Sequence, residues 1–287
     1  LLNNNIEDGD SVGVDGNISV DPKFVRGLYL ASDSPCVNAG GRSVGDAGLV
    51  GYTTRADGTA DSGQVDMGYH YLPGAAARDW YVDAVGGSDA NTGLVPESPF
   101  KTITRALAVV ADGGHVHVAA GLYDLANGEV FPLALANRYG VQLLGSGRND
   151  TIIDAHNANH RCLTMTYNYP DARVANLTLT RGRLVVLNVT SRGGGLYLNH
   201  VQGMIDDCAF IDNHLPSSST WGRQGGAGLA GVDCDVAVTD CLVSGNTATA
   251  GWADHAYGGG IYAENMGTIS HTTIVSNTVN VSGNSTF

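Results

Sequence analysis

Basic residues are scarce in this sequence. The 287 residues include 28 acidic side chains but only 15 lysines and arginines, so the formal net charge is −13, and lysine occurs only at Lys23 and Lys101. Such a surface repels nucleic acid and anionic membranes, and we expect neither as a partner. It also repels a polyuronate chain unless Ca²⁺ bridges the two. Salt adaptation or plain solubility explains the same acidity equally well.

Long apolar runs are absent as well. No stretch of 18 apolar residues occurs, so we expect no membrane span. Neither a signal peptide nor an initiator Met is visible, which indicates a mature product or an excised piece. The five cysteines are an odd number and cannot all pair within one chain.

What the sequence does contain is a repeat near its C-terminus. Three stretches begin with glycines and end with Asn, namely Gly193–Asn213, Gly225–Asn246 and Gly258–Asn277, and these Asn residues fall 33 and 31 positions apart. A fixed period of this length indicates a solenoid whose units bury their apolar faces against each other. Within each unit the apolar residues alternate or run in threes, and no helical spacing occurs. The sequence therefore predicts a parallel β-helix.

Aligning the repeats on their terminal Asn produces columns of matching residues. Phe210, Val243 and Ile274 lie three positions before the Asn, and Ile205, Val238 and Ile269 lie eight before it. Val174–Leu179 continues the pattern 31 residues before Ile205–Phe210. Cys208 and Cys241 share the column five positions back, and we expect them to stack inward as small apolar residues, with a disulfide as the alternative.

The repeat unit GG(A/G)(I/L)…(F/V/I)-x-x-N resembles the repeats of chlamydial polymorphic outer-membrane proteins. It is also similar to the wider pectate-lyase-like superfamily of right-handed parallel β-helices. The resemblance covers roughly residues 80–287 and implies an all-β, right-handed solenoid. It implies little about activity, because function depends on sites placed on the fold.

The N-terminal quarter has a different character. Residues 1–72 resemble the closing segment of bacterial secreted β-helix proteins. The resemblance implies that they are the terminal β-rich segment of another unit. The matching steps are Asp21–Phe24, Leu30–Gly40 and Asp66–Tyr71. Residues 73–79 form a linker-like break. Because the chain then ends directly after a repeat, we expect a part of a longer tandem protein, or two ends that associate end to end between molecules.

A new β-helix is predicted to begin at Trp80, with residues 80–125 as its first strand and cap and residues 141–287 as its coils. Tyr81–Asp83 is the predicted first strand. Phe100–Val110 has apolar residues at helical spacing, which predicts a short N-terminal capping helix. His115–Val118 alternates as a strand, and we expect a turn at Gly121–Tyr123.

Two carboxylates in one column are the candidate catalytic residues. Six positions before the repeat Asn the column contains Asn176, Asp207, Asp240 and His271. Neighbouring coils lie ~4.8 Å apart, so Asp207 and Asp240 are close enough to act as one acid and one base, as in a glycosidase. The alternative is structural, because Asn and Asp favour turns through their tolerance of left-handed backbone.

Two insertions between repeats carry the candidate substrate-binding residues. Two of the three tryptophans lie there, and exposed aromatic rings can stack on sugar rings. The alternative is that these rings fold back over their own loops. The residues are Trp221 and Arg223 in one insertion, and Trp252, Asp254, His255 and Tyr257 in the other.

Metal and lyase chemistry have weaker support. Asp83, Asp89 and Asn91 offer oxygen ligands that suit Ca²⁺, although turn formation explains them equally well. A calcium-assisted lyase also needs a catalytic base. Because no lysine follows Lys101, an arginine would have to act as that base. The histidines show neither an H-x-x-x-H motif nor a Cys/His cluster, so we expect no zinc site.

These observations support two classes of function. The first hypothesis is a secreted or cell-surface protein of bacterial type that binds or cleaves polysaccharide along its coils. The second is a non-catalytic adhesin or surface scaffold, in which the repeats themselves are the purpose. A calcium-assisted polysaccharide lyase is a further alternative.

Overall fold

The computed structural model describes residues 4–5, 12–71, 77–184, 191–216, 223–250 and 255–281. The chain forms two compact units. One comprises Leu1–Arg78 with Ala111–Gly114, and the other comprises Asp79–Val110 with His115–Phe287. Among the described residues, no helix is long and apolar enough to cross a membrane.

The first unit has little regular structure. Strands β1 (Phe24–Arg26) and β2 (Tyr29–Leu30) pair antiparallel, and helix α1 (Val44–Ala47) is a single turn. Its interior contains a stacked pair of rings, Tyr29 and Tyr71, whose centroids lie 3.7 Å apart. The buried Asp66 carboxylate accepts hydrogen bonds from the Thr54 hydroxyl and the Asn38 backbone N–H. Side-chain hydrogen bonds thus connect segments that no sheet joins.

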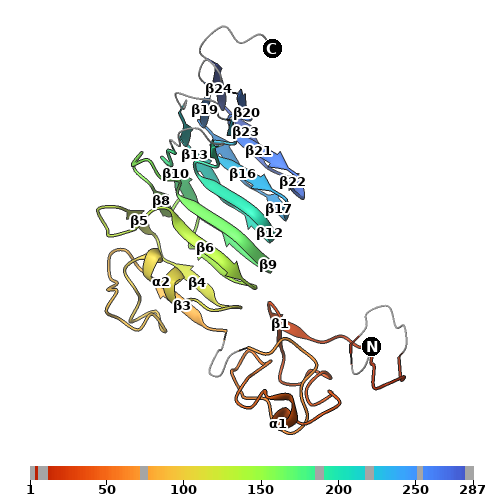
Figure 1. Cartoon of the computed structure of the whole chain (residues 1–287). Coiled ribbons are helices and arrows are strands. Elements are labelled where there is room, and N and C mark those ends of the chain that lie inside the picture. Colours follow the sequence, from red (N-terminus) through yellow and green to blue (C-terminus); the bar gives the residue numbers. More distant parts are fainter. Residues whose placement is uncertain are drawn as a thin grey trace. The chain divides into compact units, whose positions relative to one another are not determined.

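The second unit is a stack of parallel strands, one above another along a single axis (Figure 1). Its largest sheet has ten strands and forms one face of the solenoid. In chain order these are β3 (Asp79–Val82), β4 (His115–Val118), β6 (Leu133–Arg138), β7 (Gln142–Gly145), β9 (Leu163–Ala175), β12 (Leu196–Asp206), β16 (Leu229–Val232), β17 (Asp235–Thr239), β21 (Ile261–Glu264) and β22 (Thr268–Ser270).

Three further parallel sheets complete the coils. The six-stranded sheet contains β5 (Gly121–Asp124), β8 (Thr151–Asp154), β10 (Thr178–Thr180), β13 (Ala209–Ile211), β18 (Leu242–Ser244) and β23 (Thr273–Val275). One three-stranded sheet contains β11 (Ser191–Arg192), β15 (Arg223–Gly225) and β20 (His255–Tyr257). The other contains β14 (His214–Leu215), β19 (Thr247–Ala250) and β24 (Thr278–Val281). The predicted parallel β-helix is confirmed.

The repeat columns of the sequence are the strand registers of the structure. Phe210 pairs with Val243, and Val243 pairs with Ile274. Ile205 pairs with Val238 in the same way. Phe210, Val243, Ile205 and Val238 are all buried, so each column is one row of the solenoid core. Cys208 and Cys241 are buried free thiols, as expected for small inward residues.

The terminal Asn residues of the repeats form a ladder along the stack, in which Asn213 and Asn246 are buried and Asn277 is half-buried. The Asn213 amide donates to the Asn246 side-chain oxygen at 3.0 Å and to the Leu179 carbonyl at 3.0 Å. The Asn246 amide donates likewise to Asn277 and to the Phe210 carbonyl, both at 2.8 Å. A buried amide needs partners for its donors and acceptor, and the neighbouring coils supply them. The Asn period of the sequence therefore reflects hydrogen bonding between coils.

Helix α2 (Ile103–Val109) is the predicted capping helix. It begins at the N-cap Thr102, whose hydroxyl accepts a hydrogen bond from the Arg105 N–H, and it buries Ile103, Ala106 and Leu107. The predicted first strand is β3, and His115–Val118 is β4. The turn expected at Gly121–Tyr123 is wrong, because these residues form β5 in register with Thr151–Ile153 of β8.

Candidate functional site

One corner of the solenoid is built from residues with left-handed backbone. Equivalent positions in successive coils are occupied by Asn137, Tyr167, His200, Asp233 and Asn265. Their φ angles are 54°, 53°, 52°, 49° and 50°. The strand registers on either side align them. Asn and Asp adopt this conformation readily, whereas a bulky residue there is an outlier.

Two of these corner residues are aromatic and belong to an exposed cluster. Tyr167 is 49% exposed, and its ring stacks on the His200 ring at a centroid distance of 4.9 Å. We call Tyr167 and His200 the aromatic corner.

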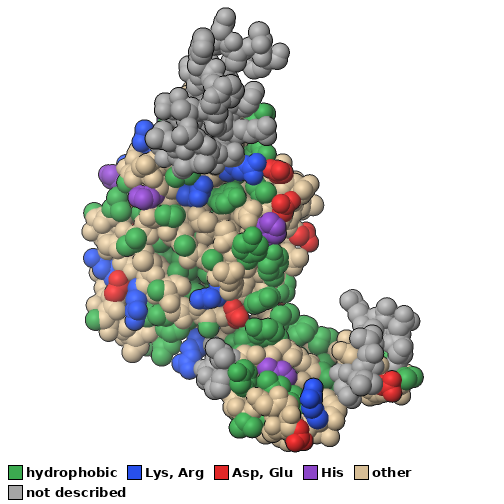
Figure 2. Space-filling model, viewed as in Figure 1, with side chains coloured by type: hydrophobic (Ala, Val, Ile, Leu, Met, Phe, Trp, Pro, Cys, Tyr) green, Lys and Arg blue, Asp and Glu red, His purple; other side chains and the backbone are tan. Residues whose placement is uncertain are grey.

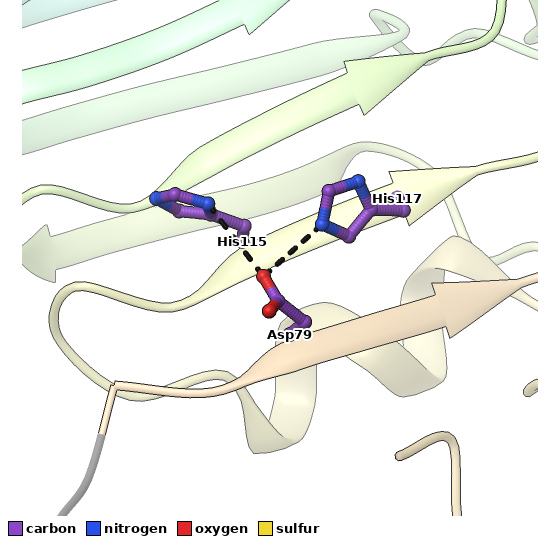
Figure 3. A group of neighbouring side chains, drawn as sticks. All are labelled: Asp79, His115 and His117. Carbon is purple, nitrogen blue, oxygen red and sulfur yellow. Dashed lines mark hydrogen bonds and ion pairs between the residues drawn. The ribbon is translucent and has the colours of Figure 1, made fainter. Parts of the chain in front are cut away.

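A second cluster lies on the outer face of the first coils and contains metal-ligating side chains. His115 and His117 alternate along β4 and so point to the same side, while Val116 between them is buried. The register of β3 against β4 places Asp79 opposite His115 and Tyr81 opposite His117. Figure 3 shows the Asp79 carboxylate between the two imidazoles.

The distances within this cluster are short. Asp79 Oδ1 lies 3.1 Å from His117 Nε2 and 3.6 Å from His115 Nδ1. One ligand atom from each of the three residues lies within 4.8 Å of the others, and all three side chains are half-buried. Within the described part of the chain, no other His, Cys, Asp and Glu side chains form such a group. We call it the Asp–His–His cluster.

A shallow groove of about 300 Å³ borders this cluster. Tyr81, His117 and Leu144 line it from neighbouring strands, and Pro96 and Pro99 line it from the loop after β3. The Tyr81 ring stacks on the His117 ring at 5.2 Å. A larger open cavity of about 1070 Å³ lies in the first unit, where Asn4, Asp21 and Asp66 are among its lining residues.

Residues 85–285 match the family described as a protein of unknown function (DUF1565). The chain belongs to this family. No curated protein matches it. The similarity to pectate-lyase-like proteins and to chlamydial repeats stays a prediction. The DUF1565 match contains His115, His117 and the aromatic corner, while Asp79 precedes it.

Within the DUF1565 region, Asp207 and Asp240 lie in a second left-handed column. Their φ angles are 45° and 54°, and Asn176 and His271 in the same column have 59° and 48°. Arg148 lies beside both, with Nε 3.4 Å from Asp207 Oδ1 and Nη1 donating to the Asp240 carbonyl at 2.9 Å. These contacts agree with the turn-forming interpretation, and the catalytic role of the two carboxylates stays a prediction.

The predicted substrate-binding residues of this DUF1565 protein are only partly described. Trp221, Trp252 and Asp254 lie outside the described residues. Arg223 of β15 and His255 of β20 are register partners, and they are described in their backbone only. Tyr257 is exposed, and its ring lies 6.5 Å from that of Tyr262. The sugar-binding platform at these insertions therefore stays a prediction.

The side chains proposed for Ca²⁺ take part in hydrogen bonds of the loop. Asp83 Oδ1 accepts from the N–H groups of Val85 and Gly86. Asp89 accepts from the N–H groups of Lys101 and Thr102 and from the Thr102 hydroxyl. The Asn91 amide donates to the Pro99 carbonyl at 2.8 Å. These bonds shape the loop before α2, and Ca²⁺ binding there stays a prediction.

The sequence analysis missed both clusters of this DUF1565 chain. For the Asp–His–His cluster a sequence signal existed, because His-x-His on a strand places two imidazoles on one face. The H-x-x-x-H motif instead applies to helices, in which residues four apart face the same way. The contribution of Asp79 depends on the pairing of β3 with β4, across 36 residues of sequence, and no local pattern marks it.

Proposed function

We propose that this protein binds a polysaccharide at the aromatic corner and acts outside the cell or at its surface. The observation that carries the proposal is Tyr167, which has left-handed backbone at a position where three of the other four aligned residues are Asn or Asp. An L-residue other than Gly, Asn or Asp pays about 1–2 kcal/mol for this conformation. The ring of Tyr167, rather than its backbone, accounts for its presence.

The chemistry of the corner suits a sugar ring. Tyrosine offers a flat apolar face with a polar edge, and exposed aromatic groups of this kind mark binding surfaces. The His200 ring, stacked on Tyr167, adds ring nitrogens that can form hydrogen bonds. The solenoid face in Figure 2 carries charged side chains scattered among uncharged ones, and the net charge is −13. We therefore favour a neutral polysaccharide.

Calorimetric titration with a panel of neutral and acidic oligosaccharides tests the proposal. Tyr167→Asn removes the ring and installs a residue that tolerates the backbone conformation, so the fold should persist. We expect at least a tenfold loss of affinity in this variant. Asp233→Asn, in the same column, is the matched control and should bind as the wild type does. Unchanged affinity in Tyr167→Asn, or no binding to any sugar, would contradict the proposal and favour an adhesin or scaffold.

Cleavage is tested separately, by reducing-end release from the same polysaccharides. Loss of release in Asp207→Asn or Asp240→Asn would identify a glycosidase that uses these carboxylates. Release that survives both substitutions and stops with a chelator would identify a metal-assisted, lyase-like centre. Sugar binding without release would leave a binding protein, which is the function proposed here.

A further inference from the structure

The geometry points to a binding site for a divalent transition-metal ion of the Zn²⁺ type, held by Asp79, His115 and His117. This site is separate from the aromatic corner, and its existence does not depend on polysaccharide binding. It would use His115 Nδ1, His117 Nε2 and one carboxylate oxygen of Asp79.

The backbone holds the three ligands close to the arrangement that such an ion needs. Zn–N and Zn–O bonds of about 2.0–2.2 Å in a tetrahedron place neighbouring ligand atoms about 3.3–3.5 Å apart. The two carboxylate-to-imidazole distances are 3.1 and 3.6 Å. Both strands lie in the ten-stranded sheet, in parallel register with each other. Two of the three ligand-to-ligand distances are thus close to those of a tetrahedral site, and the third, between the two imidazole nitrogens, is at most 4.8 Å.

The donor set selects the class of ion. Two imidazoles and one carboxylate suit Zn²⁺ and neighbouring transition metals, whereas Ca²⁺ and Mg²⁺ prefer sites made of oxygen atoms. Three protein ligands leave a fourth position for water or for a ligand from solution. The side chains are 21% to 39% exposed, so an ion can reach them from solvent.

The residues around the cluster restrain the orientation of one ligand and do not oppose the positive charge of a bound ion. The Tyr81 ring stacks on the His117 imidazole, which restrains its orientation. The next residue in the His115 column is the uncharged Gln142, followed by Arg173. Arg173 forms a two-pronged ion pair with Asp206, with both N–O distances 2.7 Å, so its charge is compensated. A bound cation thus meets no uncompensated positive charge along this column.

The test is a calorimetric titration of the full chain, without a polyhistidine tag and treated with a chelator beforehand, using zinc chloride. We expect one ion per chain, with at least a tenfold weaker affinity in each of Asp79→Asn, His115→Gln and His117→Phe. The Phe variant retains a ring beside Tyr81. His200→Asn removes a different half-exposed histidine and is the matched control, with an affinity within about twofold of the wild type.

Two further measurements distinguish the loss of a metal ligand from misfolding of a variant. Circular dichroism in chelator should be the same for all variants. Co²⁺ should produce the visible absorption of a four-coordinate ion in the wild type and in His200→Asn, but not in the variants of Asp79, His115 and His117. Absence of zinc binding in the wild type would overturn the inference. So would zinc affinity that survives the double substitution of His115 and His117, or that falls equally in His200→Asn. Sugar binding is read out separately, so failure of one proposal leaves the other intact.

Discussion

Single residues with left-handed backbone turn the corners of each coil. In the column of Asp207 and Asp240 the φ angles lie near 50°, and the side chains are those that tolerate this region best. The Thr239 hydroxyl donates to the Asp240 carboxylate at 2.9 Å. A short polar side chain at this position is therefore explained by the backbone, before any catalytic role is considered.

This explanation makes a prediction about stability. Asp240→Ala places an ordinary L-residue in left-handed backbone and should lower the free energy of unfolding by about 1–2 kcal/mol. Asp240→Asn should stay within about 0.5 kcal/mol of the wild type, because Asn tolerates the same region. Urea denaturation followed by circular dichroism measures both. Equal stabilities for the Ala and Asn variants would show that a residue preferring left-handed backbone does not stabilise this turn.

Residue-level prediction from sequence succeeded where the residue type and the backbone agree. Asp207 and Asp240 could be recognised as turn formers because their side chains have that preference. Tyr167 could not, since tyrosine has no preference for left-handed backbone and the assignment depends on its register partners Asn137 and His200. Asp79 could not be paired with His115 and His117 for the same reason. Local patterns reveal local preferences, whereas both clusters depend on pairing between coils.

At the scale of elements, two carboxylates hold the capping helix in place. The buried Glu129 side chain accepts hydrogen bonds from the N–H groups of Ile103 and Thr104 and from the Thr104 hydroxyl. Asp89 binds the residues just before the helix. The first N–H groups of a helix have no partners within it, so these carboxylates satisfy groups that burial would otherwise penalise. Glu129 was not a candidate in the sequence analysis.

We predict that Glu129→Ala lowers the free energy of unfolding by about 2 kcal/mol or more, because it leaves buried N–H groups unpaired. Glu97→Ala, an exposed position in the same unit, is the control and should change it by less than about 0.5 kcal/mol. Chemical denaturation at neutral pH measures the difference. Equal effects of the two substitutions would mean that the helix end does not depend on Glu129.

The same carboxyl group gives the stability a pH dependence. Burial raises the pKa of Glu129, and the hydrogen bonds from Thr104 and Ile103 oppose this only in part. The folded protein therefore binds the proton more tightly than the unfolded chain does. The resulting stabilisation is complete below the unfolded pKa of about 4.3 and is lost as pH rises through the folded-state pKa. Relative to the non-titrating Glu129→Gln, the wild type should lose unfolding free energy from pH 4 to 7. Parallel pH profiles would contradict this.

At the scale of the whole molecule, the spacing of the repeats was enough to predict the solenoid and its register. Val174, Ile205 and Val238 align across coils because each coil repeats the same inward positions. The first unit follows no such period. Its structure depends on individual contacts, such as the stacking of Tyr29 on Tyr71, which composition does not reveal.

A stack of coils also implies a gradient of local stability along its axis. Strand β12 has neighbours on both sides, β9 on one and β16 and β17 on the other. In the described structure, β22 pairs only with β17 and β23 only with β18. Core-column residues of these last strands are open to solvent, with Ile269 41% and Ile274 50% exposed. In a repeat protein, local opening is controlled by such contacts between neighbouring units.

We therefore predict that amide hydrogens of β22 and β23 exchange with solvent at least a hundredfold faster than those of β9 and β12. Native-state hydrogen exchange read by mass spectrometry or NMR measures this for the full chain. Strand β13, which pairs with β10 and β18, provides the internal control because it has the same length as β23 and two neighbours. Equal protection in β13 and β23 would show that another element covers the last coil, since an uncovered edge exposes its N–H groups and its apolar side chains together.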